Sequence, residues 1–168
     1  QTLRNMFRNG NRVVTTFNFN DLVNEVMLIS SSTMQRHHID IDLQLYGRPL
    51  LITGDKSQLQ QVILNLITNA SESFPANISV QKKIAIETNL CIDFFELTVT
   101  DNGSGISPEI KSNIFELLRT NKESGMGIGL WLSKTIVESH KGSITFDTDL
   151  NRGTCFTVRL PIKDDNVF

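Results

Sequence analysis

The sequence predicts one α/β (α+β) domain, a two-layer sandwich in which about three helices cover one face of a mixed, largely antiparallel sheet. With 168 residues, 39% of them hydrophobic, the chain can bury one sizeable core but is short for two ordinary domains. Its periodic segments follow the order helix, strand, helix, two strands, two helices, two strands. That order lacks the regular alternation of strand and helix that marks a doubly wound parallel sheet.

The first predicted helix runs from Asn20 to about Arg36, with Asn20 available as its cap. Its inward positions, which recur at helical spacing, are Leu22, Val26, Ile29 and Thr33. Residues 39–45 then alternate strictly between apolar and polar side chains, the period of a strand with one face in water. A turn at Gly47-Arg48-Pro49 follows this strand.

The second predicted helix shows the clearest helical period in the chain. Asp55, with Gln58 three residues later, resembles a capping box at its start. The apolar positions that keep the period are Leu59, Val62, Ile63, Leu66, Ile67, Ala70 and Phe74. Residues 83–87 and 95–100 are predicted to form two strands of a hairpin.

The C-terminal part is predicted to add two helices and a second hairpin. Pro108 favours the start of a short helix. A longer helix is expected from Gly129 to His140, where a cationic imidazole would suit the negative helix end. Residues 143–147 and 154–160 are expected to pair as the last hairpin.

Composition excludes several classes of function. The net charge of -2 gives no overall positive field that would collect nucleic acid. No apolar run approaches the roughly 20 residues that span a bilayer, and the N-terminus lacks a signal-peptide pattern. Cys91 and Cys155 are isolated and lack metal-ligand spacing. We therefore expect a soluble, cytoplasmic fragment with reduced, structural cysteines.

Two asparagines lie one turn apart on the second predicted helix. Asn65 and Asn69 are poor helix-interior residues, because their amides compete for backbone hydrogen bonds. Amide carbonyl oxygens suit a hard cation such as Mg²⁺, and Asn69 is well placed as a ligand. A solvated polar edge of the helix would explain the same pattern without a ligand.

Two glycine-containing loops complete the candidate site. Residues 101–106, Asp-Asn-Gly-Ser-Gly-Ile, follow a strand, and the carboxylate of Asp101 would accept a hydrogen bond from adenine and reject guanine. Residues 125–130, Gly-Met-Gly-Ile-Gly-Leu, bring backbone amides to a positive helix end, where phosphate binds. The alternatives are an ordinary Asp-Asn-Gly turn and a flexible loop.

The order of these segments resembles the motif boxes of sensor histidine kinases, members of the GHKL ATPase/kinase superfamily with the Bergerat fold. The matching segments are residues 59–70 for the asparagine box, 101–106 for the first glycine box, Ile114-Phe115-Glu116 for the phenylalanine box, 125–130 for the second glycine box and Gly153-Thr154 for the last. The resemblance covers roughly residues 17–161.

This resemblance implies the ATP-binding catalytic domain of a two-component kinase, which transfers the γ-phosphoryl group of Mg-ATP to a histidine on a dimerisation domain outside this chain. It implies that Asn69 binds Mg²⁺, that Asn65 supports it, that Asp101 reads adenine and that Thr154 adds a hydroxyl contact. The other implied ATP contacts are Gly103, Gly105, Ile106, Gly125, Gly127, Ile128, Gly129 and Leu130.

The resemblance also implies a mobile ATP lid at residues 117–124. Lys122 and Arg119 would meet the phosphate charge that develops during transfer. Many relatives carry a proline and aromatic residues where this chain has Leu117-Leu118-Arg119.

In related ATPases a glutamate at the position of Asn65 activates water, and an amide cannot take that proton at neutral pH. This difference favours a kinase over a hydrolase.

None of His37, His38 and His140 precedes the acidic residue and proline of a phosphoacceptor helix, so the acceptor is expected outside the chain. Residues 1–16 are expected to be the remnant of the second dimerisation helix and a linker, residues 17–161 the catalytic domain and residues 162–168 a tail. The implied partners are a dimerisation domain and a response regulator, with a homodimeric parent that is cytoplasmic or an inner-membrane sensor. The alternatives are a regulatory nucleotide-binding module without phosphotransfer and a GHKL-type conformational ATPase.

Overall fold

A computed structural model describes residues 13–75, 81–116 and 128–162. The helices in these ranges are α2 (Phe19–Arg36), α3 (Lys56–Ser71), α4 (Pro108–Lys111) and α5 (Gly129–Ser139). The strands are β1 (Val14–Asn18), β2 (Ile39–Gln44), β3 (Leu51–Asp55), β4 (Lys82–Leu90), β5 (Phe94–Asp101), β6 (Ser143–Asp149) and β7 (Gly153–Pro161).

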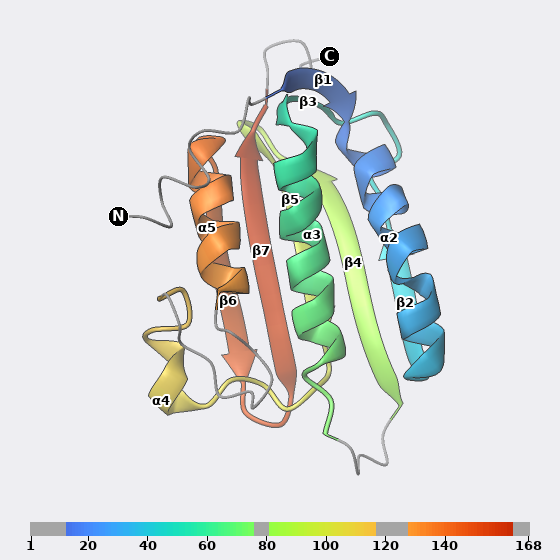
Figure 1. Cartoon of the computed structure of the whole chain (residues 1–168), viewed down its shortest axis with the longest axis vertical. Helices are drawn as coiled ribbons and strands as arrows, with labels where there is room; N and C mark the ends of the chain where they lie inside the picture. Colours follow the sequence, from blue (N-terminus) through green and yellow to red (C-terminus); the bar gives the residue numbers. More distant parts are fainter. Residues whose placement is uncertain (1–12, 76–80, 117–127, 163–168) are drawn as a thin grey trace.

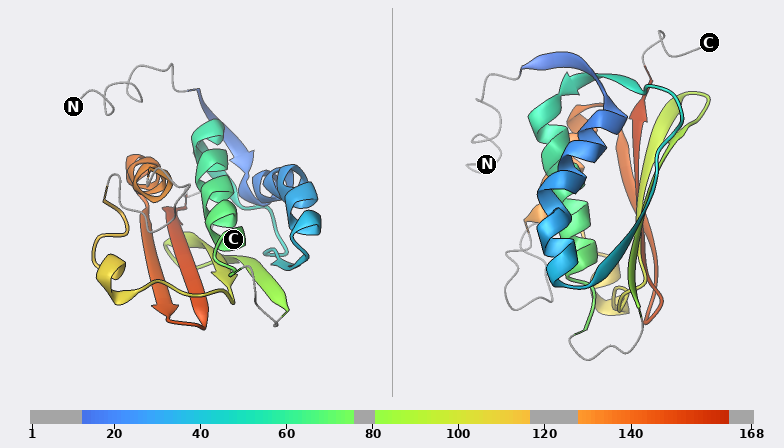
Figure 2. Two further views of the ribbon diagram at one scale, coloured as in Figure 1. Left: turned by 60° about the horizontal axis from the view of Figure 1, so that its bottom comes forward. Right: turned by 90° about the vertical axis from the view of Figure 1, so that its right-hand side faces the viewer.

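The main sheet has five strands in the order β2-β4-β5-β7-β6. β2 and β4 pair in parallel, and every other neighbouring pair is antiparallel. Helices α2, α3 and α5 lie side by side on one face of this sheet, as Figure 1 and the right-hand view of Figure 2 show. The predicted two-layer sandwich with a mixed, largely antiparallel sheet is therefore confirmed.

The central helix α3 carries its apolar face into the core between the layers, as predicted. Its fully buried side chains are Leu59, Val62, Ile63, Leu66, Ile67 and Ala70. Asp55 caps the helix, because its Oδ1 accepts hydrogen bonds from the backbone N–H groups of Ser57 and Gln58, each at 3.1 Å. From the sheet, Ile84, Ile86, Phe95, Leu97, Val99 and Val158 meet this helical layer.

The predicted cap of α2 is wrong by two residues. Asn18, not Asn20, is the cap, and its Oδ1 accepts from the backbone N–H of Asn20 at 3.2 Å. The side chain of Asn20 is buried and serves tertiary structure instead. It donates to the carbonyl oxygen of Tyr46 at 2.8 Å and accepts from the hydroxyl of Thr88 at 2.8 Å. Because two asparagines stand within one turn, the local sequence fits either as the cap.

The buried stripe of α2 also differs from the predicted one. Ile29 is 56% exposed, whereas Ser30 and Met34 are buried. The stripe follows a spacing of four residues through Leu22, Val26, Ser30 and Met34. A polar residue therefore occupies an inward position that the apolar pattern assigned to Ile29.

Strands β1 and β3 form a separate two-stranded antiparallel sheet that the sequence did not predict. Val14 pairs with Asp55 and Asn18 with Leu51, and the hydroxyls of Thr16 and Thr53 lie 2.8 Å apart. Because β1 begins at Val14, the sheet-forming part of the chain starts before residue 17, where the catalytic domain was expected to begin.

The remaining predicted elements are present with shifted ends. β4 and β5 form one antiparallel hairpin and β6 and β7 the other. α4 is shorter than the helix to about Phe115 that was expected.

Cys91 and Cys155 are free and half-buried. Within the described ranges, no helix is long and apolar enough to cross a membrane.

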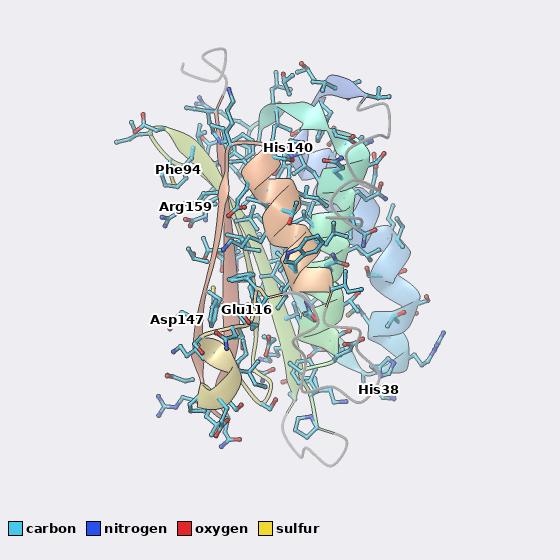
Figure 3. The ribbon with its side chains drawn as sticks, turned by 60° about the vertical axis from the view of Figure 1, so that its left-hand side comes forward. His38, Phe94, Glu116, His140, Asp147 and Arg159 are labelled. Atoms are coloured by element: carbon cyan, nitrogen blue, oxygen red, sulfur yellow. The ribbon has the colours of Figure 1, made fainter. Side chains whose placement is uncertain are left out.

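His140 ends α5, the structural position that was predicted for it. Figure 3 shows it at the end of the helix, beside the start of α3. Its Nδ1 lies 2.8 Å from the carbonyl oxygen of Ile136, and its Nε2 accepts a hydrogen bond from the backbone N–H of Asp55 at 3.0 Å. The imidazole thus links the end of α5 to the start of α3.

Candidate nucleotide site

The base-reading candidate, Asp101, is the last residue of β5 and is only 5% exposed. Its Oδ1 accepts one hydrogen bond from the backbone N–H of Gly103 and a second from the hydroxyl of Ser73, both at 2.9 Å. Two donors on one oxygen fix the plane of the carboxylate. Sequence analysis missed Ser73, because its partner lies 28 residues further along the chain.

The first glycine loop is held against two other segments of the protein. A Cβ atom on Gly103 would collide with the Ser73 hydroxyl and lie 2.8 Å from Oδ1 of Asp101. Gly105 has a φ of 69° and lies against the carbonyl oxygen of Asp149, the last residue of β6. The absence of a side chain at Gly103 and Gly105 therefore lets Ser73 and Asp149 pack against the loop. The expectation that these glycines also make room for adenine stays a prediction.

A pair of buried threonines joins this loop to β7. Thr154 stands opposite Asp101 in the pairing of β5 with β7, and its hydroxyl lies 3.0 Å from that of Thr148. The hydroxyl of Thr148 also accepts from the backbone N–H of Ile106 and donates to the carbonyl oxygen of Gly153, each at 3.0 Å. Thr148 is a second supporting residue that sequence analysis missed.

Asn65 connects α3 with α5. Its Nδ2 donates to the carbonyl oxygen of Gly129 at 3.2 Å and lies 3.3 Å from the hydroxyl of Ser133, while its Oδ1 accepts from Gln61 at 2.8 Å. Asn69 is half-buried on the same strip of α3. Ser133 is fully buried and is a third supporting residue that sequence analysis missed.

The start of α5 offers backbone amides beside Asn65. Ile128 is the N-cap residue, Gly129 and Leu130 begin the helix, and the first turn carries no acidic side chain. An eleven-residue helix with such a start is suited to bind an anion at its positive end. Lys122, Arg119, Gly125 and Gly127, together with the implied lid at 117–124, lie outside the described residues.

The phenylalanine box is anchored by aromatic contacts. Ile114 is buried, and the ring of Phe115 meets that of Phe146 edge-on with centroids 5.7 Å apart. The ammonium group of Lys134 on α5 lies 5.6 Å from the centroid of the Phe115 ring. This box therefore connects α5 with β6 next to the site.

A short helix with one perturbed carboxyl group lies between the first glycine loop and the phenylalanine box. At the start of α4, the hydroxyl of Ser107 and then the backbone N–H of Glu109 hold the pKa of the Glu109 carboxyl below its usual value.

The chemistry of these groups fits a magnesium nucleotide. Asp101 has a buried carboxylate, the start of α5 has backbone amides at a positive helix end, and Asn65 and Asn69 have carbonyl oxygens of the kind that Mg²⁺ accepts. Among the described residues, no group of three or more His, Cys, Asp or Glu side chains is placed to hold a metal ion.

The similarity to known proteins falls on the same segments. Residues 54–164 match the family described as "Histidine kinase-, DNA gyrase B-, and HSP90-like ATPase". The chain is 36% identical over 144 residues to sporulation kinase D of Bacillus subtilis, covering 85% of this chain and 28% of that protein. It is 28% identical over 164 residues to the sensor protein FixL of Bradyrhizobium diazoefficiens, covering 98% of this chain and 32% of that protein.

Among solved structures, the catalytic domain of histidine kinase ThkA superposes with a TM-score of 0.78 at 29% sequence identity. That alignment covers 89% of this chain and 95% of the ThkA domain. The chain thus corresponds in extent to a catalytic domain, and it spans about a quarter to a third of the length of the curated relatives it matches.

Proposed function

Because the chain belongs to the family of histidine kinase-, DNA gyrase B- and HSP90-like ATPases, we propose that it acts as the catalytic domain of a two-component sensor histidine kinase. It binds Mg-ATP and transfers the γ-phosphoryl group to a histidine on a dimerisation domain outside this chain. The observation that carries the proposal is the buried carboxylate of Asp101 at the end of β5, fixed by two donors opposite Thr154.

Adenine selection follows from the chemistry of this carboxylate. An ionised Asp101 can only accept hydrogen bonds, and the 6-amino group of adenine donates them. Guanine carries a carbonyl oxygen at that position, which would face the carboxylate as a second acceptor. The buried setting raises the cost of that mismatch, since an unpaired polar group is expensive away from water. Thr154 adds a hydroxyl beside the same base.

Phosphate binding is assigned to the start of α5 and to the loop that precedes it. Ile128, Gly129 and Leu130 present the helix amides, and Gly125 and Gly127 would extend this cradle. Lys122 and Arg119 would add positive charge near the transferred group. Asn69, supported by Asn65, would hold Mg²⁺, which neutralises phosphate charge when it is bound.

Asn65 favours transfer over hydrolysis. Its amide cannot act as a general base toward water at neutral pH, and its hydrogen bonds to Gln61 of its own helix and to Gly129 of α5 hold the amide in place. ATP would therefore persist until an acceptor histidine arrives. The remaining partners follow from this role. They are a response regulator that takes the phosphoryl group onward and a homodimeric parent that brings the acceptor helix to the site.

Incubation of the domain with γ-labelled ATP, Mg²⁺ and a separately made helical hairpin from the parent tests this proposal. We expect label on the hairpin histidine and little free phosphate. Asp101→Asn should remove both nucleotide binding and transfer, while the control Asp147→Asn, an exposed carboxylate on β6, should keep them.

Three results would contradict the proposal, and each points elsewhere. ATP binding without transfer to the native hairpin would indicate a regulatory nucleotide-binding module. Steady phosphate release by the isolated domain would indicate a conformational ATPase. Calorimetry that detects no association with Mg-ATP at millimolar concentration would show that the domain has no nucleotide site.

A further inference from the structure

A hydroxyl that contacts the carboxylate of Asp101 follows α3, the helix that carries Asn65 and Asn69. Two residues beyond the end of that helix, the Ser73 hydroxyl lies 2.9 Å from Oδ1 of Asp101 and 2.8 Å from the carbonyl oxygen of Ala70. The hydroxyl has one proton for these two acceptors. The acceptor to which this proton points decides whether Ser73 orients the carboxylate of Asp101 or caps the carbonyl of Ala70.

The carboxylate is the stronger acceptor, because a hydrogen bond to an ionised group is roughly twice as strong as one between neutral groups. The carbonyl of Ala70 already accepts the backbone N–H of Ser73 at 3.2 Å. If the hydroxyl proton pointed to Ala70, a lone pair of Ser73 would face the charged oxygen of Asp101. Ser73 therefore donates to Asp101.

The position of this hydroxyl is fixed by close packing. The backbone N–H of Ser104 donates to the carbonyl oxygen of Ser73 at 3.0 Å. The hydroxyl occupies the space in front of Gly103 where a side chain would otherwise stand, since a Cβ there would lie 2.7 Å from Cβ of Ser73. The end of α3 and the first glycine loop thus interlock around Oδ1 of Asp101.

We propose that Ser73 is a positioning residue for purine selection, holding the carboxylate of Asp101 in the plane that accepts the 6-amino group of the base. This inference rests on the proposed function, since it requires Asp101 to read adenine. Loss of the hydroxyl removes the donor that Ser73 supplies to Oδ1, while the Gly103 N–H stays, and the carboxylate is then held less firmly in the plane of the base. ATP would lose a well-directed hydrogen bond, whereas a 6-oxo purine nucleotide has none to lose.

The test compares the dissociation constants of ATP and inosine triphosphate, measured by calorimetry with Mg²⁺. Ser73→Ala is expected to reduce the preference for ATP over inosine triphosphate by about tenfold, the scale of one hydrogen bond to a charged group. Ser73→Cys, a weaker donor, should fall between wild type and Ser73→Ala. Ser71→Ala is the matched control, because within the described part of the chain the exposed Ser71 hydroxyl bonds only the Thr68 carbonyl of its own helix.

If Ser73 had a purely structural role, Ser73→Ala would weaken the binding of ATP and of inosine triphosphate by the same factor, and that result would overturn the inference. An unchanged ratio in Ser73→Ala, in a domain whose wild type prefers ATP, would overturn it as well and leave the proposed function intact. Failure of the wild-type domain to bind ATP would instead contradict the proposed function, and this inference would then fail as well. If Ser73→Ala does not fold, the ratio measured on Ser73→Cys decides, and a wild-type ratio there contradicts the proposal.

Discussion

Gly54 of β3 lies directly against the imidazole of His140, so that a Cβ atom on Gly54 would stand 2.7 Å from Cδ2 and 2.9 Å from Nε2 of the ring. The ring occupies this place because its Nε2 accepts the backbone N–H of Asp55 at 3.0 Å. A glycine is therefore what allows the end of α5 to reach the start of α3.

The first prediction is that Gly54→Ala destabilises the domain. The new methyl group must displace the ring or the strand, and overpacking of this kind costs about 1–3 kcal/mol in the free energy of unfolding. Urea denaturation measures the change. Gly47→Ala is the matched control, because no described residue other than its two chain neighbours has an atom within 4 Å of a Cβ placed there. Combined with His140→Ala, Gly54→Ala should cost less than it does alone, and strict additivity would show that the ring is not what the methyl group meets.

The second prediction concerns the ring itself. His140→Ala leaves the Asp55 N–H without its acceptor and should lower the free energy of unfolding by about 1–3 kcal/mol. His37→Ala serves as the control, because His37 is exposed at the end of α2 and should change stability by less than about 0.5 kcal/mol. Equal stability of the two variants in thermal denaturation would show that the link between α5 and α3 contributes nothing.

Local pattern was enough to predict the main sheet and the central helix. The apolar period of α3 and the alternation in β2 each follow from side chains a few residues apart. The sheet of β1 and β3 was missed because its strands are stabilised by pairing between distant residues, such as Thr16 and Thr53, 37 residues apart, which no local period records. The cap of α2 was misplaced because Asn18 and Asn20 carry the same local signal, and only the buried partners of Asn20 separate them.

The site shows the same division between local and distant information. Asp101, Asn65 and Gly129 were identified by residue type and spacing, and the structure connects Asn65 with Gly129 directly. Their supports Ser73, Thr148 and Ser133 were not identified, because serine and threonine are ordinary at such positions. Each becomes informative only when a partner distant in the sequence, such as Asp101 for Ser73, is brought within hydrogen-bonding distance.

The third prediction is that Thr148→Val loosens the first glycine loop. Valine has nearly the shape of threonine, but it leaves the N–H of Ile106 and the carbonyl of Gly153 without the hydroxyl that bonds both. Loss of such buried partners costs about 1–3 kcal/mol. Hydrogen exchange at the Ile106 amide should accelerate more than exchange in the centre of β5. Thr145→Val on the exposed face of β6 is the control, and faster exchange there too would indicate general weakening of the strand.

The fourth prediction concerns pH and the start of α4. The Ser107 hydroxyl, followed by the backbone N–H of Glu109, lowers the pKa of the Glu109 carboxyl from its ordinary value of 4.5. A lowered pKa in the folded state means that the unfolded chain binds the proton more tightly. The contribution to stability is therefore complete above pH 4.5 and is lost as the pH falls through the folded-state pKa.

Ser107→Ala should raise the pKa of Glu109 toward 4.5, because the first of its two donors is removed. A carboxyl-detected NMR titration measures that pKa directly, and amide exchange in α4, followed as the pH is lowered through it, reports whether the helix start opens when Glu109 is protonated. Ser112→Ala, at the other end of α4, should leave the titration unchanged. If Ser107→Ala left the Glu109 midpoint where it is in the wild type, the hydroxyl would not be the main cause of the lowered pKa. The hydrogen bond from the backbone N–H of Glu109 would then be the main cause of the lowered pKa.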